Sequence, residues 1–140
     1  MDPHIHLIDE TWIAASPAAL AAVVAEPGNW VRWWPDLELT VSRDRGIKGI
    51  EWTARTVARG SGLAGSVEIW LEPFAEGVIL HHFLRLTVVS GRPLSRRRFA
   101  ARQRDYAWRA KRVFWPVKDE LERAGRAPDA GRSSPERSRR

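Results

Sequence analysis

Between Ser16 and Asp36 the chain encodes two short helices back to back, with a predicted strand before them and a run of predicted strands after them. Ser16 is a suitable N-cap, and Pro17 fits the first helical position, where its missing N–H leaves no hydrogen bond unmade. Pro27 is expected to end this helix after about three turns. A strand, two short helices and then a series of strands is an unusual order, and it largely decides which folds are open to the chain.

The second helix of this segment is rich in tryptophan. We expect it to open at Asn29 and to end before Pro35. Trp30, Trp33 and Trp34 recur in it at spacings of three and four residues, so that one face of the helix presents three indole rings. Three indoles so close together need a large apolar surface to cover them.

Length and composition indicate one soluble domain. The 140 residues fit a single domain, and 44% apolar composition with eight tryptophans is enough to build a core. The absence of cysteine excludes disulfides and thiolate metal sites and agrees with a reducing compartment. The sequence lacks the features of a signal peptide and any apolar run of membrane-spanning length. We therefore expect a cytoplasmic protein without a membrane span.

The end of the chain differs in composition from the rest. After Gly125, five arginines stand against Asp129 and Glu136, so this segment contributes +3 to the formal net charge of +6. Its Pro, Gly, Ser and Arg residues offer nothing to bury, and we expect residues 125–140 to form a disordered basic tail. The folded domain is expected to span residues 1–124 and to be only mildly basic.

Alternation of apolar and polar residues predicts a sheet. A strand is expected over residues 4–14, and from residue 37 onward the period is two. Short turns separate the later strands and favour an antiparallel meander. The expected later strands cover residues 37–43, 46–55, 66–73 and 77–89.

One long amphipathic helix is predicted from Arg96 to Arg123. Pro116 removes the hydrogen bond to the carbonyl of residue 112, so we expect a kink or a split there. All these elements share one core only if a curved antiparallel sheet grips the last helix, an α+β fold in which the space between sheet and helix becomes a pocket. The apolar stripe of the helix consists of Phe99, Tyr106, Ala110, Val113, Val117 and Leu121.

Four short motifs resemble those of a known superfamily. They are IAASP at the end of the first strand, EPGNWVRWWP, IWLEP, and KDELE near the end of the last helix. On these motifs the chain resembles the helix-grip, START-like or SRPBCC superfamily, in particular its polyketide cyclase/dehydrase-like branch, over about residues 5–124. Typical members have about six or seven strands, whereas five are predicted here, so the sheet is expected to be trimmed and the pocket small.

The resemblance implies an internal cavity for a lipid, a polyketide or an aromatic compound. Members range from cyclases to carriers and sensors, so fold does not fix the chemistry. We predict a small hydrophobic ligand as the partner, and no cofactor. An enzyme that catalyses aldol-type cyclisation or dehydration is the alternative, and an interaction protein that acts through its basic C-terminal helix is a second alternative.

The phase of each strand predicts which side chains line the cavity. The first strand is ambiguous, because both of its faces carry apolar residues. One face holds Leu7, Asp9, Thr11 and Ile13, and the other holds Ile8, Glu10 and Trp12. The predicted ligand-binding residues are Thr11, Trp52, Ile69, Leu71, Leu80, His82, Leu84, Tyr106, Ala110 and Val113.

His82 and Tyr106 are the inward pair that is able to move a proton, because an imidazole and a phenol are suitable acid and base partners. The simpler interpretation, which we favour, is a hydrogen-bonded histidine within the core. A catalytic role needs a converging geometry that a sequence does not show. The two residues are therefore the catalytic candidates for the enzyme alternative.

The four histidines of the chain suggest a metal site. His4, His6, His81 and His82 lack a carboxylate or cysteine at a recognisable ligand spacing, so we favour strand histidines over a metal site.

Gly60, Gly62 and Gly65 match the phosphate-binding pattern of dinucleotide sites. The residues that follow alternate as a strand, whereas that pattern requires a helix. We expect a hairpin loop at the mouth of the pocket, and no nucleotide site.

One segment before and within the long helix is strongly basic. Residues 92–112 hold nine basic residues against Asp105, with Phe99, Tyr106 and Trp108 among them. We favour a solvated helix face there over a nucleic-acid or anionic-membrane surface.

The strand phase also places aromatic side chains on the outer face of the sheet. Trp70, Phe83 and, with one phase of the first strand, Trp12 would lie there. A homodimer formed through this outer face would bury them.

Overall fold

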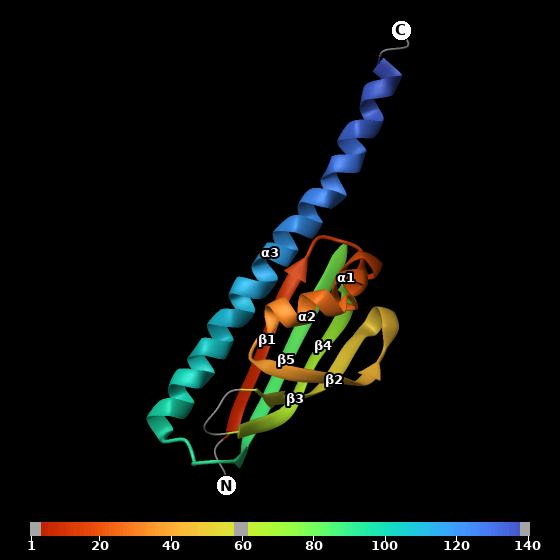
Figure 1. Ribbon diagram of the computed structural model, residues 1–140. Helices are drawn as coiled ribbons and strands as arrows, with labels where there is room; N and C mark the ends of the chain where they lie inside the picture. Colours follow the sequence, from red (N-terminus) through yellow and green to blue (C-terminus); the bar gives the residue numbers. More distant parts are fainter. Residues whose placement is uncertain (1–3, 58–61, 138–140) are drawn as a thin grey trace.

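The computed structural model describes the backbone of residues 4–57 and 62–137, and the side chains within these ranges up to residue 126. A strand, two short helices, four further strands and a long helix follow one another (Figure 1). The elements are β1 (His4–Ile13), α1 (Pro17–Val24), α2 (Pro27–Trp33), β2 (Leu37–Asp44), a 3-10 turn η1 (Gly46–Lys48), β3 (Gly49–Thr56), β4 (Gly62–Phe74), β5 (Gly77–Ser90) and α3 (Arg96–Arg137).

The two short helices are present, but Pro27 has a different role from the predicted one. Ser16 caps α1, since its hydroxyl accepts a hydrogen bond from the Ala19 amide at 3.1 Å. The expectation that Pro27 ends the first helix and Asn29 opens the second is wrong: α1 already ends at Val24, and Pro27 is the first residue of α2. The physical reason is that a proline at the first helical position needs no N–H, so it starts a new helix as readily as it ends an old one.

The strands of the described residues form one antiparallel sheet in the order β1-β5-β4-β3-β2. The first strand pairs with the last, so β1 and β2 lie at opposite edges of the sheet. The α1–α2 segment carries the chain from one edge to the other across the inner face (Figure 1). The curved α+β arrangement predicted from the sequence is confirmed.

The last helix lies on the same face of the sheet as α1 and α2, and its closest strand is β1. It continues through Pro116 as one helix, so of the two expected outcomes the split does not occur, and the kink stays a prediction. The helical backbone extends to Arg137. The domain boundary at residue 124 and the disorder of residues 125–140 stay predictions, since side chains beyond residue 126 lie outside the described part.

Alternation predicted the inner face of the sheet correctly for β3, β4 and β5. Trp52, Ile69 and His82 are all buried, whereas Arg85 on the opposite face of β5 is exposed. The phase of β1, left open by the sequence, places Leu7, Asp9, Thr11 and Ile13 inside. Ile8 and Trp12 therefore face outward.

Aromatic side chains fill the space between the sheet and the helices. Trp34 lies with its ring centroid 5.5 Å from that of Trp52 on β3, and 6.4 Å from that of Phe114 on α3. Trp33 contacts Phe114 as well, at 5.6 Å between centroids. Trp30 is half-buried and donates its indole N–H to the carbonyl of Val24 at 2.6 Å. The sheet and the helices together bury Trp33 and Trp34 and leave Trp30 half-buried; Trp34 follows α2 as its C-cap residue, whereas the sequence predicted it within the helix.

The glycine-rich pattern belongs in part to a strand. Gly62 and Gly65 lie in β4, so they do not form the predicted hairpin loop, and Gly60 lies outside the described residues. A Cβ at position 65 would come within 1.8 Å of the carbonyl oxygen of Arg85 on β5. Close approach of two backbones, and no phosphate, explains this glycine.

We expect Gly65→Ala to destabilise the protein by roughly 2 kcal/mol or more, because β4 and β5 have to shift apart to admit the methyl group. Gly125→Ala is the matched control, since a Cβ there meets nothing within 4 Å and alanine favours a helix. Urea unfolding followed by tryptophan fluorescence measures both changes. Equal stability of the Gly65→Ala variant and the parent would contradict the close-approach account.

Candidate functional site

Most of the residues predicted to bind a ligand lie within the filled core. Val113 lines the larger of the two pockets described below, and Tyr106 lines the smaller one. The other eight line neither of them. A contact of these eight with a ligand stays a prediction; they are Thr11, Trp52, Ile69, Leu71, Leu80, His82, Leu84 and Ala110, all buried.

His82 is enclosed by aromatic rings. Its ring centroid lies 5.6 Å from that of Trp34 and 5.3 Å from that of Phe114. Burial lowers the pKa of His82 to about 4, against smaller opposing effects of the Asp9 charge and the Glu68 backbone. The imidazole is therefore neutral at pH 7, and its Nδ1 has no hydrogen-bond partner among the described residues.

A buried carboxylate that we did not select from the sequence lies beside His82. Asp9 is the residue of β1 that pairs with His82 across the ladder, and its Oδ1 contacts Lys111 Nζ of α3 at 2.6 Å. Its Oδ2 has no partner within the described chain, and the same holds for Thr11 Oγ1 and Trp52 Nε1. Asp9 shares one face of β1 with Leu7, Thr11 and Ile13, and this alternation was the only indication in the sequence that Asp9 points inward. Alternation alone did not decide which face of β1 is the inner one.

Tyr106 has partners other than His82. Its hydroxyl donates to Asp36 Oδ2 at 2.7 Å, and Arg109 pairs with the other oxygen of the same carboxylate. The Arg109 guanidinium also lies over the Tyr106 ring, 4.9 Å from its centroid. Burial, and then the hydrogen bond to Asp36, raise the pKa of Tyr106 well above its usual value. The phenol is therefore a proton donor held by Asp36, and sequence reasoning missed both of its partners.

A small cavity opens beside this cluster. Its volume is about 180 Å³, and charged side chains dominate its lining. The residues are Asp36, Thr56, Arg102, Asp105, Tyr106 and Arg109. With so little space and so many charges, it suits water or a small ion better than an apolar ligand.

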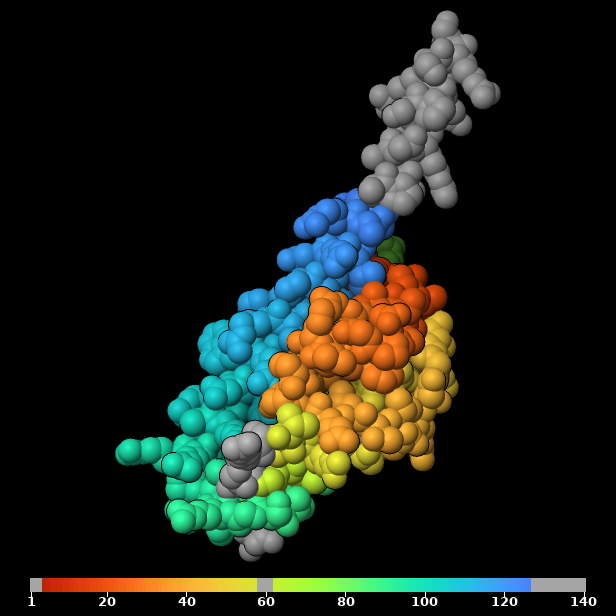
Figure 2. Space-filling view, viewed as in Figure 1, coloured from red at the N-terminus to blue at the C-terminus, as the bar shows by residue number. Residues whose placement is uncertain are grey.

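The larger pocket lies between the short helices and the C-terminal half of α3, which are neighbours on one face of the molecule (Figure 2). Its volume is about 490 Å³. The apolar wall consists of Val23, Trp33, Val113, Pro116, Val117, Leu121 and Ala124. The polar lining consists of Asn29, Arg32, Arg112 and Glu120.

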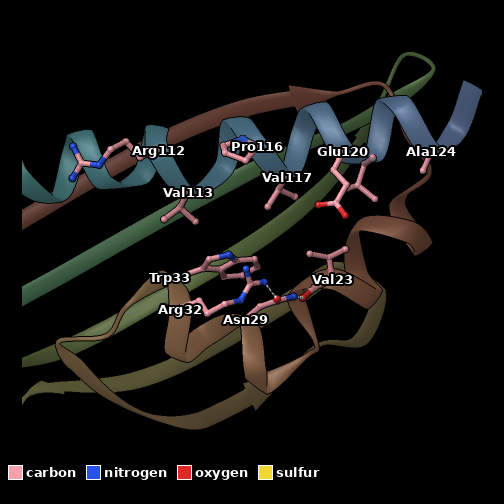
Figure 3. Close-up of a pocket in the computed structure, with 11 residues that line it drawn as sticks. Val23, Asn29, Arg32, Trp33, Arg112, Val113, Pro116, Val117, Glu120 and Ala124 are labelled. Carbon is pink, nitrogen blue, oxygen red and sulfur yellow. Dashed lines mark hydrogen bonds between the residues drawn. The ribbon is translucent and has the colours of Figure 1, made fainter.

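Charge is distributed unevenly along this pocket. Arg32 approaches from α2 and Arg112 from α3, with Glu120 two turns further along α3 (Figure 3). Arg32 donates to the Asn29 side chain, whose Nδ2 in turn donates to the carbonyl of Val23 at 2.8 Å. Within the described ranges no ion pair engages Arg112. An apolar body can lie against the apolar wall while an acidic group meets one of the two arginines.

Apart from Val113, none of the residues that line this pocket was among those predicted to bind a ligand. The side chains come from the facing sides of α2 and α3, and neither helix shows from its own sequence which neighbour it will face. Pro116 adds to the wall, and its missing N–H leaves the carbonyl of Arg112 without its helical partner. The one feature of the sequence that could have indicated this pocket is Pro116, a proline within an otherwise regular apolar stripe of the helix.

The histidines do not converge. His81 and His82 lie on opposite faces of β5, and in the described part of the chain no three His, Cys, Asp or Glu side chains form a metal-binding group. On the outer face, His81 stacks on Trp70 at 4.4 Å between centroids. Its ring nitrogens lie 2.9 Å from Glu72 and 3.2 Å from Glu10. The predicted homodimer through this face stays a prediction.

Comparisons with known proteins give the fold. No family model matches the sequence, and no curated protein matches it. Mll3558 from Rhizobium loti is 14% identical, with a TM-score of 0.61 over 85% of this chain and 98% of that one. The di-domain ARO/CYC protein StfQ of the steffimycin biosynthetic pathway is 12% identical, with a TM-score of 0.55 over 87% of this chain and 52% of that one.

A further similar structure is DynU16, a protein of the dynemicin biosynthetic locus. It is 15% identical, with a TM-score of 0.53 over 83% of this chain and 49% of that one. This chain thus spans about half the length of both biosynthetic proteins. At such low identity the likeness shows the fold alone, a curved antiparallel sheet that grips a long C-terminal helix. No helix of the described residues is long and apolar enough to cross a membrane.

We expect His82 to make stability depend on pH in the acidic range. Because its pKa is about 4 in the folded protein and about 6.5 in an unfolded chain, the unfolded state binds the proton more tightly. The stabilisation is complete above pH 6.5 and falls by roughly 3 kcal/mol as the pH drops to about 4. His82→Leu removes this slope, whereas His6→Gln on an exposed position keeps it; denaturant unfolding at several pH values measures the difference.

Tyr106 is the single tyrosine of the chain, so its ionisation can be followed directly by ultraviolet difference absorbance. We expect it to titrate well above free tyrosine, and Asp36→Asn to move its pKa back toward the usual value. Since the unfolded phenol ionises near pH 10, the free energy of unfolding falls as the pH rises above about 10. Asp44→Asn, at the exposed end of β2, is the control that leaves the titration unchanged.

Proposed function

We propose that this protein binds a small hydrophobic ligand of the kind handled by polyketide cyclase/dehydrase-like proteins, a lipid, a polyketide or an aromatic compound. The observation that carries the proposal is the pocket of about 490 Å³ between α2 and α3, with its largely apolar wall. Sites for small molecules have volumes of roughly 300–1,000 Å³ and combine an apolar lining with a few polar groups. A cytoplasmic location belongs to the same proposal, supported by the lack of cysteine.

The lining also indicates the chemistry of the ligand. The apolar wall is mostly aliphatic, and Trp33 adds to it only the 5% of its surface that stays exposed, so an apolar ligand body gains chiefly from area burial. Arg112 lies at one end of the pocket and Arg32 lies beside Asn29 on the opposite wall (Figure 3). Either guanidinium group is able to bind a carboxylate through paired hydrogen bonds. An amphipathic ligand with an apolar body and one acidic group fits both features.

Binding without catalysis is favoured over aldol-type cyclisation. The two acid–base candidates do not line this pocket: His82 is enclosed by Trp34 and Phe114, and Tyr106 donates to Asp36. A cyclase needs such groups within hydrogen-bond reach of the reacting atoms. A carrier or a sensor needs only the cavity.

The test uses an anionic probe, anilinonaphthalene sulfonate, and the neutral probe phenylnaphthylamine, followed by fluorescence titration. Val117→Trp fills the pocket, so we expect it to weaken both probes about tenfold or more. Arg112→Gln should weaken the anionic probe about three- to tenfold, because one charge-assisted contact is lost at a solvent-exposed position, and leave the neutral probe unchanged.

Arg43→Gln on the exposed strand β2 is the matched control and should bind both probes like the parent. Unchanged affinity of both probes for Val117→Trp would exclude this pocket as the ligand site. Native mass spectrometry of the protein purified from its own host then identifies the ligand class by the mass that co-purifies.

A further inference from the structure

Two tryptophans of α3 are exposed to solvent, away from both pockets of the site. The exposed fractions are 61% for Trp108 and 53% for Trp115, which lie seven residues apart. Positions seven apart in a helix share a face, so both indoles project from one side of α3. Water is a poor solvent for large rings, and paired exposed indoles usually mark a surface that contacts something else.

Basic residues accompany these indoles at the same period. Arg97, Arg104, Lys111 and Lys118 recur every seven residues, in the row next to Trp108 and Trp115. Lys111 Nζ lies 5.9 Å from the centroid of the Trp115 ring. We call the surface formed by Arg104, Trp108, Lys111 and Trp115 the α3 tryptophan face.

A shallow groove runs between the two indoles of this face. Its volume is about 340 Å³, and it is lined by the apolar side chains of Ala107, Trp108 and Trp115 and by Arg104 and Lys111. The groove thus places an apolar slot directly next to two cationic side chains. A phospholipid has the complementary structure, since its acyl chains adjoin a phosphate.

The face keeps a positive charge after its own ion pairs are counted. Lys111 pairs with the buried Asp9 at 2.6 Å, and Lys118 pairs with Glu122 at 2.6 Å. Arg104 is exposed and has no ion pair within the described residues. Arg97, seven residues earlier in the same row, is exposed as well. The surface that meets a partner therefore presents the exposed guanidinium groups of Arg97 and Arg104, with the exposed carboxylate of Asp119 one turn beyond Trp115.

We propose that the α3 tryptophan face docks on the surface of an anionic phospholipid bilayer. Indole rings favour the boundary between headgroups and acyl chains, and neighbouring arginine and lysine side chains reach the phosphates. Both indoles project from the same side of α3, about 10 Å apart along the helix axis, which suits a flat partner. The proposal does not depend on the ligand proposed for the pocket.

Two other partners fit this face less well. A second copy of the chain would bring the row of cations of one α3 against the same row of the other, and like charges at such positions repel. A nucleic acid would satisfy the cations, but single-stranded bases need stacking platforms along a basic groove, whereas here the groove between the indoles is apolar. Both become outcomes of the experiment.

The experiment measures flotation of the full chain with vesicles of phosphatidylcholine alone and with about one-third phosphatidylglycerol. We expect binding only to the anionic vesicles, with a blue shift of tryptophan fluorescence, and loss of binding in high salt. The double variant Trp108→Ala/Trp115→Ala should bind at least tenfold more weakly. Arg104→Gln should bind about fivefold more weakly, the effect of one charge near such a surface.

Matched controls distinguish this face from exposed side chains in general. Phe74→Ala removes another exposed aromatic ring, and Arg43→Gln another exposed guanidinium; both should bind like the parent. Thermal unfolding shows that each variant is folded, which we expect because the changed side chains project into solvent. A double variant that fails to fold is replaced by Trp108→Gln and Trp115→Gln, tested singly.

Several outcomes overturn the proposal. They are no binding to anionic vesicles, equal binding to neutral vesicles, and equal binding of the double variant and the Phe74→Ala control. Light scattering that shows a dimer which Trp108→Ala/Trp115→Ala dissociates assigns the face to a second copy instead. Binding of a labelled oligonucleotide, lost in the same variant and without vesicle binding, assigns it to nucleic acid.

Discussion

The contact between the α2 indoles, the sheet and α3 is the constraint on which the other features depend. Trp34 packs against Trp52 of β3 and Phe114 of α3, and Trp33 packs against the same phenylalanine. Without this cluster the two short helices would have no apolar anchor, because α1 and α2 are too short to be stable by themselves. The same rings fill the centre of the domain. The larger cavity therefore lies beside the cluster, where α2 and α3 diverge.

Polar contacts hold α3 at two further points. Lys111 reaches Asp9 on β1, and the Tyr106 hydroxyl and Arg109 both bind Asp36, in the link between α2 and β2. These ties connect one helix to the first strand and to the segment after α2. Because buried groups without partners are costly, such pairs restrict the register of α3 more sharply than apolar contact does. They fix the wall that α3 contributes to the pocket.

Three sides of α3 have different surroundings. The side with Phe114 and Ala110 closes the core, and the side with Val113 and Val117 lines the pocket. The side with Trp108 and Trp115 faces solvent beside a row of cations. A ligand in the pocket and a membrane surface against the tryptophan face would therefore contact the same helix without competing for the same side chains. Pro116 lies in the pocket wall, in the middle of this helix.

The sequence by itself determined the order of elements, the antiparallel sheet and the inner phase of three strands, since alternation and helical spacing are local properties. It left β1 ambiguous and misassigned Pro27, because both phases of β1 carry apolar residues and a proline suits a helix start and a helix end. Only the tertiary structure decided where the cavity lies and that Tyr106 meets Asp36. A cavity is the space that side chains from distant segments leave unfilled, and no local pattern records how such side chains meet.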